Sequence, residues 1–120
     1  MPRRTDSLTH LDRQRLERAT AHYLRDCYNR GTAARVSELA AHVGISAADL
    51  SRFASAVLGM SLRDFLRARQ VARAEELLRT TPLAIEDIAV RCGFGTSSTF
   101  YRWFIAAHGM APGAYRRIMK

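Results

Sequence analysis

The sequence is poor in cysteine and in long apolar runs, and each shortage excludes a class of protein. Its 120 residues include two cysteines, Cys27 and Cys92, far apart and without Cys or His neighbours at metal-ligand spacing. Such a pair makes neither a disulfide framework nor a zinc site, so we expect two buried, reduced thiols. No stretch resembles a membrane span or a secretory signal, which predicts a cytoplasmic protein with no membrane partner.

Acidic residues are also scarce. The chain has 11 Asp and Glu against 19 Lys and Arg, which gives a net charge of +8 and a pI of about 10.7. Residues 1–35 carry +4, residues 36–80 carry +1 and residues 81–120 carry +3, so the excess lies towards the two ends. A solvated basic surface and a polyanionic partner both fit this composition.

The residue patterns of an enzyme are missing as well. No nucleophile–base pair, phosphate-binding loop or pair of carboxylates stands out. The four histidines are scattered, without partners at catalytic or metal-ligand spacing: His10, His22, His42 and His108. We therefore expect no enzymatic activity, no metal and no cofactor.

Helical periodicity is what the sequence has in abundance. Apolar residues recur at three-to-five-residue intervals, and no segment alternates at period two for long enough to predict a strand. The predicted helices cover residues 7–28, 37–44, 47–58, 62–79, 85–92, 97–107 and 112 to the C-terminus. This pattern predicts an all-α fold of seven helices.

The second half of the chain repeats the first. Residues Glu38-Leu-Ala40 match Asp87-Ile-Ala89 at an offset of 49, and the offset becomes 50 after one added residue. The other matched pairs are Gly44 and Gly93, Arg52 and Arg102, and Gly59-Met60 and Gly109-Met110. The repeat predicts one domain, 1–120, with helix-turn-helix subdomains at 7–60 and 81–120 joined by a connecting helix at 61–80.

The second unit shows most clearly how such a motif is built. Gly93 supplies the tight corner between two short helices. Phe100, Trp103 and Phe104 fall at i, i+3 and i+4, so they form the buried stripe of the second helix. The opposite face carries hydroxyls and a guanidinium, on Ser97, Ser98, Thr99 and Arg102. A helix with this polar face suits the major groove of DNA.

Taken together, these motifs resemble the DNA-binding domain of the AraC/XylS family of bacterial transcription regulators. The matching segments are Gly44-Ile-Ser, Leu50-Ser-Arg-Phe53, Gly59-Met-Ser-Leu-Arg-Asp-Phe-Leu66, Arg73-Ala-Glu-Glu-Leu-Leu78, Ile85-Glu-Asp-Ile-Ala89, Gly93-Phe94, Phe100-Tyr-Arg-Trp-Phe104 and Gly109-Met-Ala-Pro-Gly-Ala-Tyr-Arg116. The resemblance implies a seven-helix domain that enters two adjacent major grooves. It also implies a nucleoid-associated activator that helps to recruit RNA polymerase.

The resemblance also implies which residues contact DNA. The base-reading positions fall on Ala48, Ser51, Arg52, Ser97, Ser98, Thr99 and Arg102. Phosphate contacts are expected from Ser46 and Thr96, at the starts of the two recognition helices, and from Tyr101. Arg can bridge two acceptors of guanine, so Arg52 and Arg102 are the leading candidates.

The sequence departs from the family pattern at several positions. Gly95 replaces a polar cap, Gln70 replaces an Arg in the connecting helix, and Ala54 leaves a thinner core in the first unit. The first recognition helix begins Ala47-Ala48-Asp49, which offers few donors and an acid that phosphate would repel.

Three functions therefore stay open at this stage. The first is monomeric, sequence-specific DNA binding that activates transcription. The second is an interaction protein that contacts RNA polymerase or another regulator, with weak DNA contact. The third is an architectural protein that binds DNA without specificity. We expect either a small stand-alone regulator or a fragment of a larger one, because no sensing domain accompanies the repeat.

Overall fold

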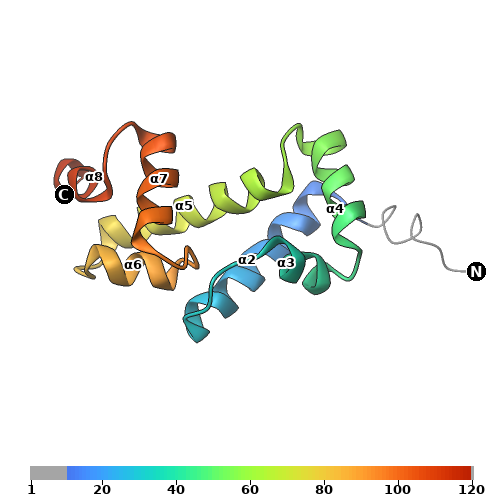
Figure 1. Ribbon diagram of the computed structural model, residues 1–120, viewed down its shortest axis with the longest axis horizontal. Helices are drawn as coiled ribbons and strands as arrows, with labels where there is room; N and C mark the ends of the chain where they lie inside the picture. Colours follow the sequence, from blue (N-terminus) through green and yellow to red (C-terminus); the bar gives the residue numbers. More distant parts are fainter. Residues whose placement is uncertain (1–10, 120) are drawn as a thin grey trace, which may run out of the picture.

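A computed structural model describes residues 11–119, which form an elongated body of 55 × 28 × 22 Å (Figure 1). These residues form seven α-helices and no strand, so the all-α prediction is confirmed. The helices are α2 (Arg13–Arg30), α3 (Val36–Val43), α4 (Ala47–Phe53), α5 (Leu62–Thr80), α6 (Ile85–Arg91), α7 (Ser97–His108) and α8 (Pro112–Met119).

The start of the first predicted helix needs correction. We expected it to begin at Ser7, but residues 11 and 12 are not helical and α2 begins at Arg13. Asp12 is its N-cap, and the carboxylate accepts a hydrogen bond from the amide of Arg15 at 2.7 Å. Such a cap satisfies a backbone donor that the helix cannot, and it therefore fixes where the helix starts. Residues 7–10 lie outside the described part of the chain.

The start of the second recognition helix, α7, also differs from expectation. Its N-cap is Thr96, so Gly95 does not replace the cap as we expected. Gly95 is instead the residue added in the second copy of the repeat, and it has a φ of +82°. That left-handed conformation suits glycine, which has no Cβ.

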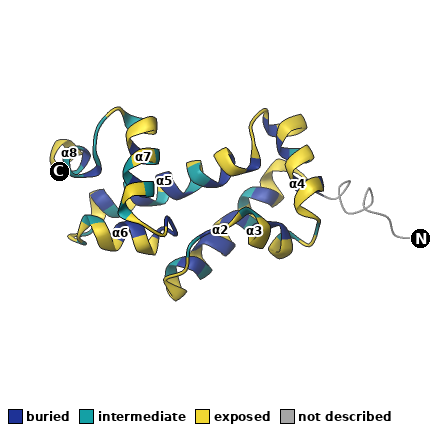
Figure 2. Cartoon of the chain, viewed as in Figure 1, coloured by how far each residue is buried: buried dark blue, intermediate teal, exposed yellow. Residues whose placement is uncertain are grey.

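Two hydrophobic cores lie at the two ends of the connecting helix α5. Leu62, Phe65 and Leu66 belong to the core of the first unit, together with residues of α2, α3 and α4. Val71, Ala74 and Leu78 belong to the second core, together with residues of α6, α7 and α8. The buried residues of α5 accordingly run along most of its length (Figure 2).

The helix that begins with α4 ends in a π-helical turn, η1 (Ala54–Leu58). In the regular helix predicted over residues 47–58, Leu50, Phe53 and Val57 would lie on one side. A π turn takes an extra residue per turn and so rotates the residues that follow it. Ala54 and Leu58 face the core as a result, and Val57 is 54% exposed.

Both cysteines are buried and free, as predicted. Burial raises the pKa of the Cys92 thiol to about 12, and the nearby positive charge of Arg73 opposes this shift only in part. The folded protein therefore favours the neutral thiol.

We expect Cys92 to resist alkylation at pH 8 until the protein unfolds. Because its pKa is higher in the folded state, its contribution to stability is complete below the unfolded value of 9.0 and is lost as the pH rises towards 12. Iodoacetamide labelling with and without urea, followed by mass spectrometry, tests the first point. Urea unfolding between pH 8 and 11, with Cys92→Ala as the control, tests the second. Rapid labelling of Cys92 in the native protein would contradict the first, and a stability difference from Cys92→Ala that stays constant between pH 8 and 11 would contradict the second.

Candidate nucleic-acid interface

The second recognition helix, α7, separates an apolar face from a polar one. Phe100 and Phe104 are fully buried and pack edge to face, with ring centroids 5.6 Å apart. Ser98 and Arg102 are exposed on the outer side, and Ser97 and Thr99 are half-buried. Within residues 11–119, Arg102 makes no ion pair or hydrogen bond. Its guanidinium is therefore available to an acceptor from outside the chain.

The first recognition helix, α4, presents fewer polar groups. Ala48, Ser51 and Arg52 are exposed, as a role in DNA binding requires. Asp49 is buried and forms an ion pair with Arg52, so the acid does not lie on the surface where we expected phosphate to repel it. The side chain of Arg52 stays 65% exposed beside it. The buried carboxylate therefore orients a guanidinium that still faces solvent.

The three residues predicted to contact phosphate differ in how many hydrogen bonds their hydroxyl groups already make within the protein. The Ser46 Oγ accepts the amide hydrogen of Asp49 at 3.1 Å and keeps its own proton for another acceptor. The Thr96 Oγ1 accepts from the amide of Thr99 and donates to the Thr99 hydroxyl at 3.0 Å. Tyr101 is half-buried, with its ring edge-on to Phe100.

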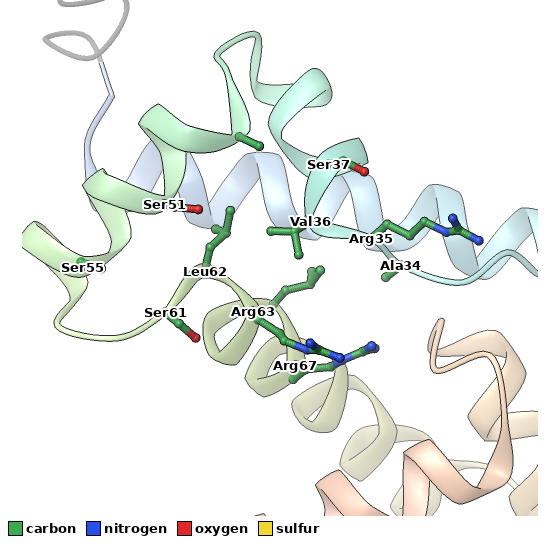
Figure 3. A pocket seen from close by; sticks show the side chains of 12 residues that line it. Ala34, Arg35, Val36, Ser37, Ser51, Ser55, Ser61, Leu62, Arg63 and Arg67 are labelled. Carbon is green, nitrogen blue, oxygen red and sulfur yellow. The ribbon is translucent and has the colours of Figure 1, made fainter.

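A cleft beside α4 brings in arginines that the sequence analysis missed. It encloses about 670 Å³ between α4, the start of α3 and the first turns of α5. Ser51 lines it, together with Arg35, Arg63 and Arg67 (Figure 3). Arg63 and Arg67 are four residues apart, which places them on one face of a helix. The i, i+4 spacing of these two arginines could have predicted a basic face on this helix. The net charge of only +1 over residues 36–80 drew attention away from it.

Arg67 also lies beside the second recognition helix, since its guanidinium carbon is 5.9 Å from the centre of the Trp103 ring on α7. Burial lowers its pKa, and the positive charges of Arg63 and Arg102 lower it further. These three residues, Arg63, Arg67 and Arg102, are called the central arginine cluster below. Like charges held this close repel one another, and a bound anion would relieve that repulsion.

The histidines are better connected than the sequence suggested. His22 Nδ1 lies 3.2 Å from His42 Nε2, and His108 Nε2 lies 2.5 Å from a carboxylate oxygen of Glu75. Each pair joins residues 20 or more positions apart, beyond what local spacing can predict. In the described part of the chain, no three His, Cys, Asp or Glu side chains converge as metal ligands. None of its helices has the length and apolarity needed to cross a membrane.

Known proteins share both the sequence and the fold. A family model described as "Helix-turn-helix domain" matches residues 39–118. The HTH-type transcriptional regulator YfiF of Bacillus subtilis, described as uncharacterized, is 37% identical over 86 residues, or 72% of this chain and 27% of its own. The HTH-type transcriptional activator AarP of Providencia stuartii is 32% identical over 81 residues, or 68% of this chain and 60% of its own.

Two solved structures extend the comparison. The DNA-binding domain of AdpA, solved in complex with a target DNA, superposes with a TM-score of 0.72 at 26% identity and covers 86% of this chain and 90% of that one. The C-terminal domain of AraT, a response regulator from Geobacillus stearothermophilus, gives a TM-score of 0.70 at 31% identity and covers 86% of this chain and 84% of that one.

Tandem helix-turn-helix units with outward polar faces are typical of DNA-binding transcription regulators. The chain belongs to the AraC/XylS family of such regulators, as the resemblance predicted. It spans 27% and 60% of the length of the two curated relatives above.

The caps of the two recognition helices give a stability prediction. We expect Ser46→Ala and Thr96→Ala each to lower the free energy of unfolding by about 1 kcal/mol, because each removes the acceptor for a backbone amide at the start of a helix. Urea denaturation measures this loss. Ser98→Ala, at an exposed position inside α7, is the matched control and should change little. Equal losses in all three variants would show that the caps do not anchor these helices.

Proposed function

We propose that this chain binds DNA sequence-specifically by placing α4 and α7 in two adjacent major grooves, and that it activates transcription. One observation carries the proposal: both helices bury an apolar face, and the side chains that fall at base-reading positions are exposed or half-buried on the opposite side. Two grooves on one side of a duplex are about 34 Å apart, a span that suits recognition helices at the two ends of an elongated body.

The strongest base contacts belong to Arg102 and Arg52. Each guanidinium is exposed and matches the paired acceptors of guanine. Arg52 is held by Asp49, so it meets a base in one preferred orientation. Ser51 and Ser98 supply hydroxyls, and Ala48 supplies a methyl group for contact with thymine. Ser97 and Thr99 are half-buried and contribute from the first turn of α7.

Phosphate contacts anchor the complex between these two helices. Arg63 and Arg67 lie between the recognition helices and, with Arg102, concentrate positive charge at the centre of the molecule. Ser46 and Thr96 add contacts at the helix N-termini, where backbone amides favour anions, and Tyr101 adds one from the second turn of α7. Arg63 and Arg67 line the same cleft as Ser51, so they supply hydrogen-bond donors beside α4, which has few of its own.

Activation, the polymerase contact and the monomeric state are parts of the same proposal. The relative AarP is named a transcriptional activator, and a tandem repeat reads two segments without a partner. We assign the protein to the bacterial nucleoid, in the cytoplasm. The competing interaction function gains support from Val57 and Met60, which are apolar and exposed at the end of the first unit. It loses support because Asp49 is turned away from the surface.

Selection of bound duplexes from a random DNA pool tests sequence specificity. We expect one asymmetric site, bound at least ~10³-fold more tightly than random DNA at physiological salt. Arg102→Ala should weaken that site by about 1–3 kcal/mol and relax the preference at one base pair, because it removes a bidentate contact. Fluorescence anisotropy titrations of matched and substituted duplexes measure both effects.

Arg79→Ala is the control for these titrations. Arg79 is exposed at the end of α5, and its substitution removes the same charge as Arg102→Ala. Equal weakening on every sequence by Arg102→Ala would contradict a base-reading role. A two-fold symmetric site would contradict monomeric binding. Specific binding only with RNA polymerase present would favour the interaction function.

The central arginine cluster gives a prediction of a different kind. Arg63→Ala should weaken binding to all sequences about equally, because a phosphate contact carries no sequence information. The slope of log K against log salt should fall by about one unit, since one fewer counterion is released. Titrations from 50 to 300 mM salt measure the slope. An unchanged slope would remove Arg63 from the interface.

A further inference from the structure

Helix α2 belongs to the first helix-turn-helix unit, residues 7–60, but it also contacts the second. It packs against α3 of the first unit, against the connecting helix α5 and against α6 of the second unit. In Figure 1 its C-terminal end reaches the region where the two units meet. The two units are therefore joined by more than the connecting helix α5.

Tyr28, in the last turns of α2, makes the first of two contacts with the second unit. The guanidinium carbon of Arg91, on α6, lies 5.5 Å from the centre of its ring, and Arg91 Nη1 donates to its hydroxyl at 3.3 Å. The guanidinium carbon of Arg73, on α5, lies 4.5 Å from the same ring. A cation over an aromatic face is attracted to it, so one ring holds residues from two other helices.

The segment after α2 makes the second contact. The amide of Ala34 donates to the carbonyl oxygen of Gly93 at 2.8 Å, at the corner between α6 and α7. A Cβ on Gly93 would lie 3.1 Å from the Ala34 nitrogen and 3.2 Å from its Cβ, so the two backbones meet without room for a side chain. Gln70 of α5 donates to the neighbouring carbonyl of Cys92 at 2.8 Å.

From these contacts we infer that α2 and the segment 31–35 form a second link between the units, which sets the separation at which the chain accepts its two DNA segments. The inference rests on the function proposed above. A single helix such as α5 can bend or twist, whereas a second attachment at the corner of α6 and α7 fixes the direction of α7 relative to α4. Tyr28 is a positioning residue, because it acts on DNA through the placement of α7.

The consequence is strict selection of spacing. One inserted base pair moves the second segment by about 3.4 Å and rotates it by about 34° around the duplex. A molecule with fixed recognition helices cannot follow that change and loses contacts at one segment. We expect wild-type affinity to fall by ~10-fold or more for each insertion or deletion of one base pair between the segments.

The test uses the full chain and the site obtained by selection, with spacers changed by one and two base pairs. Tyr28→Ala should bind the native spacing less tightly and should show a several-fold smaller penalty for altered spacing. Tyr28→Phe keeps the ring beneath the arginines and should retain the wild-type spacing profile. Arg91→Ala removes an exposed side chain outside the core and should act like Tyr28→Ala, whereas the charge-matched Arg79→Ala should not. A wild-type spacing profile in both Tyr28→Ala and Arg91→Ala would overturn the inference.

A measurement without DNA separates this inference from the proposed function. Spin labels at Ala56→Cys and Ile105→Cys, both exposed, report the distance between the units by pulsed electron paramagnetic resonance, while the native cysteines stay buried. We expect a narrow distance distribution in the otherwise wild-type chain and a broader one with Tyr28→Ala. A broad distribution without that substitution, or no broadening with it, would overturn the link. Failure to select any DNA site would contradict the proposed function and leave this measurement decisive for the link.

Discussion

The structure depends on a single helix that is apolar on different faces at its two ends. At 100° per residue, Leu62, Phe65 and Leu66 of α5 fall on one side, and Val71, Ala74 and Leu78 fall on another. Each set completes a separate core, so neither unit can bury its apolar residues without this helix. The sequence of α5 thus determines both the stability of each unit and the angle at which the units meet. That angle in turn directs the two recognition helices.

At the point where α5 changes from one core to the other lies a buried polar side chain. Gln70 is fully buried, donates to the carbonyl of Cys92 and accepts a hydrogen bond from Arg67 at 3.0 Å. A buried amide without partners would destabilise the fold, so this position is stable only when the corner of α6 and α7 and the guanidinium are both in place. The junction of the units is therefore specified by hydrogen bonds, which require one geometry, as well as by apolar contact, which permits several.

Local features could be predicted from the sequence, and features that depend on distant contacts could not. Helical periodicity predicted the seven helices and the matched glycines predicted the two corners, because each of these signals is local. The burial of Asp49 was missed, since it depends on how the helices of the first unit pack together. The arginine cleft and the contact of Ala34 with Gly93 were missed for the same reason. The predicted DNA contacts remain predictions, but the exposed positions of Arg52 and Arg102 are those that such contacts require.

The two corner glycines of the repeat show how the copies have diverged in their physical roles. Gly44 has a φ of +91° and no atom within 4 Å of where a Cβ would be, so glycine is favoured there by backbone conformation alone. Gly93 has a φ of +79° and is also crowded by Ala34 and Gln70, so both conformation and space favour glycine. The two corners are thus alike in backbone conformation but not in packing. The second corner is the place where α2, its following segment and α5 converge, and α7 starts from that corner. The recognition helix with more polar side chains at base-reading positions, α7, is therefore also the one that starts beside contacts from both α2 and α5.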